Sequence, residues 1–169
     1  MSSKILWFTG ISGVGKTTLS NKIFSILKKK FKCKKIDGDI FRKKNKVKNT
    51  FSKKNIIFNN LKIINYISRI KYKYDFILVS VISPLKSTRL KSKKKFNLNY
   101  FEIFVSCNLK TLEKRDTKGL YKKAKKNLIK LIGYNSKIQY EKSSYKVIKI
   151  NTSKVNIKDA AKKVLISIN

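Results

Sequence analysis

The sequence contains no histidine, one proline, two cysteines and six glycines, and these shortages exclude several classes of protein. Without histidine there is no Ser-His-Asp triad, no Cys-His pair and no histidine-ligated zinc. Cys33 and Cys107 lie far apart and form no Cys-x-x-Cys motif, so we expect small buried side chains and not a disulfide framework. Catalysis must therefore come from carboxylates, lysine, arginine, hydroxyl groups or the backbone.

Long hydrophobic runs are also missing. No apolar stretch approaches the roughly 18 residues that a bilayer-spanning helix needs, and the first nine residues do not have the pattern of a secretory signal. A chain of 169 residues has the length of one domain and can bury a core without disulfides or metals. We expect a single domain, residues 1–169, in the cytoplasm and without membrane contact.

Acidic residues are scarce, because 8 Asp and Glu stand against 43 Lys and Arg, for a formal net charge of +35. A basic surface is the usual signature of nucleic-acid binding. However, the chain has 39 lysines and only 4 arginines, the lysines are scattered, and the frequent Ile, Asn, Phe and Tyr share A/T-rich codons. A dedicated binder more often has arginines in a localised patch. We therefore favour drift in base composition over specific nucleic-acid binding, and keep a basic RNA-binding protein as the alternative from another class.

Hydrophobic patterns predict strands that alternate with helices. Apolar runs predict strands at residues 5–8, 76–81 and 101–105, and shorter segments predict strands at 33–36 and 146–150. Helical patterns occupy residues 19–27, 56–70, 109–114, 120–132 and 160–168. This alternation is typical of an α/β fold with a mainly parallel, doubly wound sheet, in which ligands bind beyond the carboxyl ends of the strands.

Three of the six glycines lie in the segment 10–17, GISGVGKT, which fits the pattern G-x-x-x-x-G-K-[ST]. Between a strand and a helix this pattern forms a phosphate-binding loop, or P-loop, whose backbone N–H groups approach phosphate oxygens. Lys16 would reach the β/γ-phosphates and the Thr17 hydroxyl would bind Mg²⁺. The sequence thus predicts a three-layer P-loop NTPase fold. Its predicted nucleotide-binding residues are Gly10, Ser12, Gly13, Gly15, Lys16 and Thr17.

The predicted strand at 76–80 ends without a carboxylate, so the acid that organises Mg²⁺ must come from elsewhere. Asp37 and Asp39, on either side of a glycine, follow another predicted strand and could point toward the γ-phosphate. One would organise the metal while the other orients or deprotonates an attacking hydroxyl. An Asx-turn that only ends the strand is the alternative. The G-protein pattern N-K-x-D is absent, which argues against a GTPase.

A charged segment, residues 115–121 (RDTKGLY), follows a predicted strand and helix. Small P-loop kinases have a mobile lid here, which supplies cations to the transferring phosphoryl group. A helix cap with solvated charges is the alternative for this segment.

From residue 6 to about residue 141 the sequence resembles the adenylylsulfate kinases, and ISP (82–84), RDTKGLY and the Asp-Gly-Asp spacing make the resemblance specific. These enzymes use MgATP to phosphorylate the ribose 3′-hydroxyl of adenosine 5′-phosphosulfate (APS), giving PAPS. The resemblance implies ATP and Mg²⁺ as cofactors, APS as the small-molecule substrate in sulfate activation, a homodimer, and an ATP sulfurylase as a candidate partner. The runner-up is another P-loop kinase, acting on a small metabolite or a nucleoside monophosphate.

The resemblance also implies roles for individual residues. Lys16, Asp37, Asp39 and Lys118 would be catalytic, Thr17 and Asp39 would hold the metal, and Thr18 would join the P-loop in holding ATP. The APS site would be lined by Asp39, Arg42, Phe51, Asn59, Ile82, Ser83 and Lys118.

Two departures fall in the acceptor site. Asn55 and Ile56 stand where the family pattern has an Asp and an Arg that faces the sulfonucleotide. A charge-assisted hydrogen bond to a bound anion contributes on the order of 1.5–3 kcal/mol. We therefore expect APS binding that is weak for the class, with the phosphoryl-transfer machinery less affected.

The scattered charge leads to a first prediction. RNA binding should be weak, indifferent to sequence and steeply lost as salt is added, because counterion release alone would drive it. A filter-binding titration against unrelated RNAs at several salt concentrations measures this. Nanomolar, sequence-selective binding at physiological salt would instead favour the RNA-binding alternative.

Overall fold

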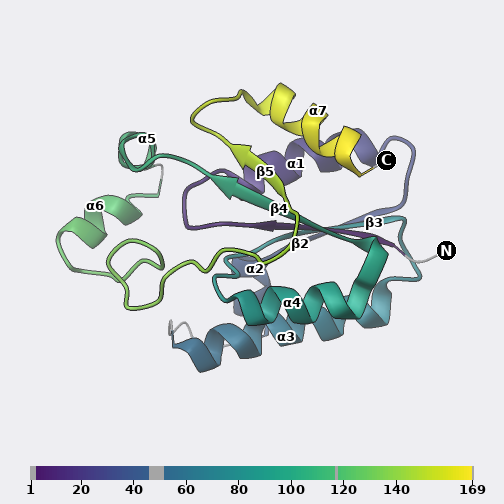
Figure 1. The fold of residues 1–169 in the computed structure, drawn as a ribbon, viewed down its shortest axis with the longest axis horizontal. Coiled ribbons are helices and arrows are strands. Elements are labelled where there is room, and N and C mark those ends of the chain that lie inside the picture. Colours follow the sequence, from purple (N-terminus) through teal and green to yellow (C-terminus); the bar gives the residue numbers. More distant parts are fainter. Residues whose placement is uncertain (1–2, 46–51, 117, 169) are drawn as a thin grey trace.

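The computed structural model describes residues 3–45, 52–116 and 118–168. In these ranges five parallel strands form one sheet in the order β2-β3-β1-β4-β5, between two layers of helices (Figure 1). The strands are β1 (Lys4–Thr9), β2 (Cys33–Asp37), β3 (Phe76–Ser80), β4 (Tyr100–Ser106) and β5 (Ile148–Asn151). The predicted three-layer α/β fold with a parallel sheet is confirmed.

The long helices cover the two faces of the sheet. Helices α1 (Lys16–Leu27) and α7 (Ile157–Ser167) lie on one face, and α3 (Lys53–Ile70) and α4 (Lys86–Phe96) lie on the other (Figure 1). The short helices are α2 (Gly38–Lys44), α5 (Leu109–Arg115) and α6 (Leu120–Lys125), and a 3₁₀ turn (Asn97–Asn99) leads into β4. None of the helices in the described ranges combines the length and the hydropathy of a membrane span.

Strand β1 lies in the middle of the sheet and is buried on both faces. Leu6 and Phe8 pack in the cluster beneath α1 and α7, whereas Ile5 and Trp7 pack against α3. A strand covered on both sides needs apolar residues at consecutive positions, which explains the continuous run in the sequence. The register places the end of β1, and the P-loop after it, at the centre of the carboxyl edge.

One predicted helix is shorter in the structure, and the sequence patterns did not indicate α2 or α4. Helix α4 was missed because its buried positions include Thr88, Arg89 and Ser92, which give no apolar periodicity. The helix predicted over 120–132 ends at Lys125, and Asn127 has a left-handed φ of 56°. The later apolar residues of this stretch do not continue one helical face, because they belong to turns that contact different parts of the core.

A buried ion pair joins α4 to β4. Arg89 Nε lies 3.2 Å from Glu102 Oε1, and both side chains are at most 1% exposed. The Glu102 carboxylate also accepts hydrogen bonds from the hydroxyls of Ser143 and Tyr145, so the segment that precedes β5 is attached to the same pair. A buried charge is tolerated only when it is paired and hydrogen-bonded, as here.

We predict that Glu102→Gln lowers the free energy of unfolding by about 3–5 kcal/mol, because it leaves the Arg89 guanidinium buried without its counter-charge. Urea unfolding followed by circular dichroism measures the change. The matched control is Glu113→Gln, which removes the partly exposed ion pair with Lys125 and should leave the midpoint close to that of the parent. Equal midpoints for the two variants would contradict the prediction.

Candidate active site

The P-loop connects β1 to α1 and has room only for glycine at its first position. Gly10 has a φ of +142°, and a Cβ built there would lie 2.1 Å from the Val105 carbonyl oxygen of β4. Gly13 and Gly15 also have positive φ values, of 77° and 92°. Throughout the described ranges, no backbone N–H of residues 11–15 donates to another protein group. These amides remain available for an anion at the helix N-terminus.

Lys16 is half-buried, and its Nζ donates to the Ile11 carbonyl oxygen at 2.7 Å. Burial lowers the pKa of Lys16 to about 8. The charges of Asp39 and Asp37 partly oppose this shift by raising the pKa, and the charge of Lys118 lowers it further. The structure thus brings Asp37, Asp39 and Lys118 within electrostatic range of Lys16, at the carboxyl edge of the sheet.

Asp37 does two things at the end of β2. Its carboxylate accepts hydrogen bonds from the N–H groups of Asp39 (3.0 Å) and Ile40 (3.3 Å), which caps α2. It also accepts one from the Thr17 hydroxyl at 3.1 Å. The turn considered from the sequence is present, and it points the carboxylate at the P-loop.

Asp39 is exposed and forms an ion pair with Arg42. The structure therefore places Asp37, and not Asp39, in contact with Thr17. Hydroxyl and carboxylate oxygens are the ligands that Mg²⁺ prefers, so Thr17 and Asp37 fit the ion. The part of the chain described contains no group of three or more His, Cys, Asp or Glu side chains that could hold a metal ion.

Three of the predicted acceptor residues, Asn59, Ile82 and Ser83, lie on α3 or after β3. Ser83 is buried, and its hydroxyl donates to Asn60 Oδ1 at 2.7 Å. Asn59 is 4% exposed, and its Oδ1 has no partner among the described residues. A buried acceptor without a partner is rare in proteins and suits a donor group on a ligand. Ile82 is half-buried, and Phe51 lies outside the described residues.

Ile56 does not offer a polar group to this side of the site. It is 8% exposed and packs in a small apolar cluster with Leu85, Ile132 and Ile138. The position at which the family pattern has an arginine therefore contributes hydrophobic packing in this chain.

Arg89 connects the acceptor side to the segment before β5. Its guanidinium donates to the carbonyl oxygens of Ser83 and Glu141, and lies 4.8 Å from the ring centroid of Tyr140. The Tyr140 hydroxyl in turn lies 2.8 Å from Thr9 Oγ1, directly before the P-loop. The Thr9–Tyr140 contact could not be predicted from local patterns, since 131 positions separate the two residues.

The lid segment is attached to the P-loop. The carboxylate of Asp116 accepts hydrogen bonds from the N–H groups of Tyr121 and Lys122 at the start of α6. The Tyr121 hydroxyl donates to the Ser12 carbonyl oxygen at 2.8 Å. Lys118 is exposed, and lies close enough to lower the pKa of Lys16.

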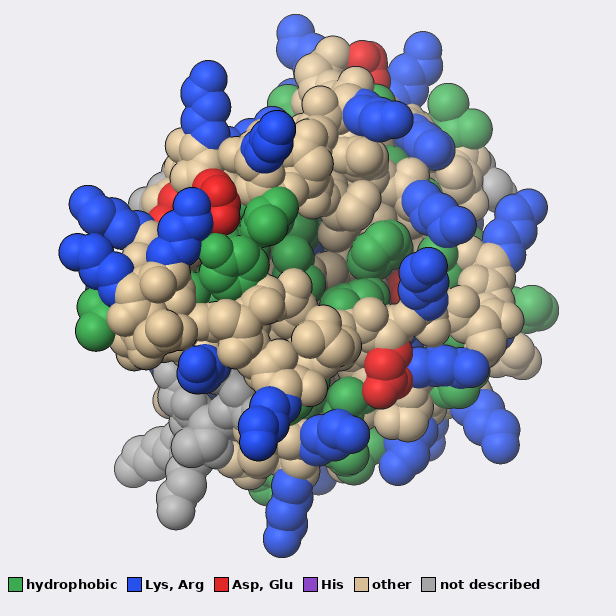
Figure 2. All heavy atoms as spheres, turned by 60° about the vertical axis from the view of Figure 1, so that its left-hand side comes forward, with side chains coloured by type: hydrophobic (Ala, Val, Ile, Leu, Met, Phe, Trp, Pro, Cys, Tyr) green, Lys and Arg blue, Asp and Glu red, His purple; other side chains and the backbone are tan. Residues whose placement is uncertain are grey.

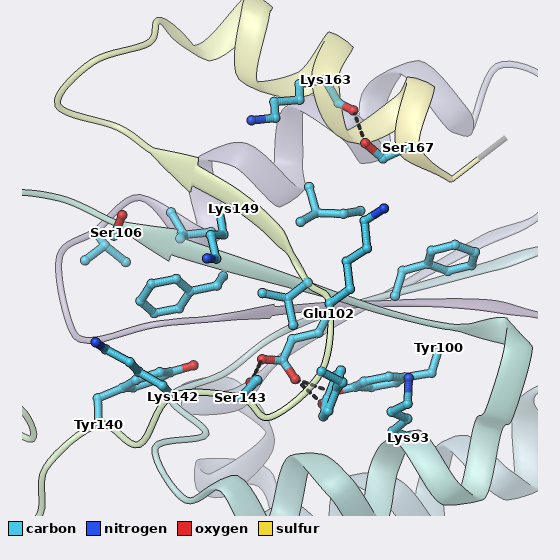
Figure 3. Close-up of a pocket in the computed structure, with 18 of the residues that line it drawn as sticks. Lys93, Tyr100, Glu102, Ser106, Tyr140, Lys142, Ser143, Lys149, Lys163 and Ser167 are labelled. Carbon is cyan, nitrogen blue, oxygen red and sulfur yellow. Dashed lines mark hydrogen bonds between the residues drawn. The ribbon is translucent and has the colours of Figure 1, made fainter.

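A cavity of about 1240 Å³ lies elsewhere, along β4 and β5. Figure 3 shows Tyr140, Lys142 and Ser143 on one side of β4 and Lys163 and Ser167 on the other. Its lining contains none of the predicted site residues, although Ile11 and Val14 of the P-loop reach it. We therefore assign the candidate site to the grouped side chains at the carboxyl edge and not to this cavity.

Figure 2 shows lysine and arginine spread over one whole face, around a hollow with hydrophobic side chains, and not gathered in one patch.

A parallel sheet with a P-loop between its central strand and α1, and with α6 hydrogen-bonded to that loop, is the arrangement of a P-loop kinase. The family model for adenylylsulphate kinase matches residues 2–150. The chain belongs to the adenylylsulfate kinase family, and the resemblance seen in the motifs is confirmed.

Individual relatives agree with this assignment. The chain is 32% identical to an adenylyl-sulfate kinase of Synechococcus sp. (strain JA-3-3Ab), over 96% of this chain and 92% of the relative. It is also 32% identical to a probable adenylyl-sulfate kinase of Archaeoglobus fulgidus, over 90% and 97%. Among solved structures, the Mycobacterium tuberculosis APS kinase CysC in complex with AMPPNP and APS has a TM-score of 0.85 and 26% identity, over 99% of this chain and 97% of that one.

The lowered pKa of Lys16 leads to a prediction about ATP affinity. Bound phosphates stabilise the ammonium and raise its pKa, so binding takes up a proton when the pH lies above about 8. Affinity for the non-hydrolysable analogue AMPPNP should therefore fall between pH 7 and pH 9. Calorimetry in buffers of different ionisation enthalpy measures the uptake, and Lys16→Ala should abolish it. No proton uptake by the parent at pH 9 would contradict the prediction.

Proposed function

We propose that the protein is an adenylylsulfate kinase, which transfers the γ-phosphoryl group of ATP to the 3′-hydroxyl of APS and releases ADP and PAPS. The observation that carries the proposal is the grouping of Asp37, Asp39 and Lys118 around Lys16, in a chain of this family. A P-loop kinase for another small metabolite is less well supported, because the family match covers most of the chain.

The P-loop side of the site would hold the nucleotide. The free amides of residues 11–15 and the Lys16 ammonium would bind the phosphates, and Lys16 would leave the Ile11 carbonyl to do so. Gly10, Ser12 and Thr18 complete the proposed ATP site. Thr17, with Asp37 or Asp39, would hold Mg²⁺, which neutralises charge on the β- and γ-phosphate oxygens when it is bound.

The acceptor side would hold APS. Asp39 is the proposed group that orients or deprotonates the 3′-hydroxyl, with Asp37 as its partner. Asn59 Oδ1, which has no hydrogen-bond partner among the described residues, supports a role in binding, and Arg42 forms an ion pair with Asp39. Ile82, Ser83, Phe51 and Lys118 complete the proposed lining. The apolar surroundings of Ile56 support APS binding that is weak for the class.

Some properties of the whole protein remain proposals. We propose that residues 1–169 act as a single domain, that the enzyme works in the cytoplasm as a homodimer, and that an ATP sulfurylase is its partner. Light scattering on the purified protein tests the dimer, since a monomer at micromolar concentration would contradict it.

The direct test offers the purified protein MgATP with APS, shikimate, gluconate or a nucleoside monophosphate and measures ADP release for each. APS should be the acceptor that is turned over. Lys16→Ala should lose at least ~10³-fold of the rate, because an aligned cation stabilises charge on the transferring group. Turnover of a different acceptor would contradict the substrate, and a Lys16→Ala rate within tenfold of the parent would contradict the site.

Lys118 provides a separate prediction about the lid. Lys118→Ala should lower kcat with little change in the affinity for ATP, because a lid cation acts on the closed, reacting complex. Steady-state kinetics with saturating APS separates the two effects. A loss of ATP affinity at unchanged kcat would make Lys118 a ground-state ligand of ATP.

A further inference from the structure

Side chains donate hydrogen bonds to three carbonyl groups of the P-loop. Lys16 Nζ donates to the Ile11 oxygen, the Tyr121 hydroxyl to the Ser12 oxygen at 2.8 Å, and the Thr152 hydroxyl to the Val14 oxygen at 3.1 Å. Tyr121 belongs to α6 and Thr152 follows β5, at 109 and 138 positions from the carbonyls that they contact. The two hydroxyl contacts are not used by the proposed chemistry.

The geometry of the peptide unit gives these contacts a consequence. In a trans peptide the C=O of one residue and the N–H of the next point in opposite directions. The bond from Tyr121 to the Ser12 carbonyl therefore sets the direction of the Gly13 N–H, and the bond from Thr152 to the Val14 carbonyl sets the direction of the Gly15 N–H. Gly13 and Gly15 are the residues that would otherwise rotate most freely, because glycine accepts many backbone conformations.

We propose that Tyr121 and Thr152 are positioning residues, which hold the P-loop in its phosphate-binding conformation before the nucleotide arrives. The inference rests on the proposed function only in that the loop binds ATP. Neither residue needs to touch the nucleotide for this role. Each one holds a carbonyl group, and the N–H of the same peptide unit is the group that would bind phosphate.

The surroundings of Tyr121 keep its hydroxyl in place. The side chain is buried, its ring packs edge-on against Tyr134 at 5.3 Å, and a Cβ at Gly13 would lie 3.3 Å from it. Burial also raises the pKa of Tyr121 to about 12, so the hydroxyl keeps its proton and can donate at neutral pH. Because α6 begins two residues after Lys118, the same bond links the lid segment to the loop.

Thr152 is fixed through its backbone. The Thr152 N–H donates to the Ser106 carbonyl oxygen at 2.9 Å, and the Thr152 carbonyl oxygen accepts a hydrogen bond from the Arg115 guanidinium at 3.0 Å. The hydroxyl also lies 3.2 Å from the Ser106 oxygen, so its one hydrogen is shared between that carbonyl and Val14. The tether from Thr152 should therefore be the weaker of the two.

The test removes each hydroxyl while keeping the shape of the side chain. Tyr121→Phe and Thr152→Val are compared with the parent by calorimetry with Mg²⁺ and AMPPNP, and by steady-state kinetics. Loss of a buried hydrogen bond should weaken AMPPNP binding and raise KM for ATP by about three- to tenfold, with the larger effect in Tyr121→Phe. KM for APS and kcat should change less, because the P-loop binds the ATP phosphates equally in the ground state and in the transition state.

Two further variants separate positioning from general packing. Tyr134→Phe removes a hydroxyl from the neighbouring ring, where it donates to Glu113 and not to the P-loop, and should leave AMPPNP affinity at the parent value. Thr152→Ser keeps the hydroxyl and should restore most of the affinity lost in Thr152→Val. Parent-like affinity in Tyr121→Phe, or equal losses in Tyr121→Phe and Tyr134→Phe, would overturn the proposal. AMPPNP binding needs no acceptor, so failure to phosphorylate APS would overturn the proposed function without affecting this test.

Discussion

The close approach of the P-loop to β4 determines how the rest of the site is assembled. At Gly10 the chain passes so near the Val105 carbonyl that a Cβ would lie 2.1 Å from its oxygen. The loop therefore lies over the ends of β1 and β4, within reach of the segments that follow β4 and β5. Because all five described strands are parallel, the residues after β2 and β3 reach the same edge. Asp37, Ser83, Tyr121 and Thr152 thus converge from four different connections.

The few acidic residues are all engaged in specific contacts. Each of the eight accepts a hydrogen bond or forms an ion pair in the structure: Asp37, Asp39, Asp75, Glu102, Glu113, Asp116, Glu141 and Asp159. Several of these contacts fix helix starts or join segments that are distant in sequence. Exposed charges individually contribute little to stability. Lysines can therefore accumulate over the surface of such a chain without disturbing the fold, provided that these eight acidic residues are kept.

The sequence was sufficient for the features that depend on local patterns. The apolar run of β1 and the P-loop pattern beside it predicted the fold and the location of the nucleotide site. Helix α4 could not be predicted, because a polar network around Arg89 replaces the apolar face that marks a helix. Contacts such as Tyr121 to Ser12 were also out of reach, since nothing in either local sequence indicates the other. The roles assigned to Asp39, Asn59 and the other site residues stay predictions.

The central claim is that ATP and APS meet over the P-loop, between the ends of the strands and the lid. A crystal structure with Mg²⁺, AMPPNP and APS tests it most directly. We expect Lys16 to move from the Ile11 carbonyl to the phosphates, and APS to lie beside Asn59 with its 3′-hydroxyl near Asp39. APS bound instead in the cavity along β4, or a 3′-hydroxyl far from the γ-phosphate, would contradict this arrangement.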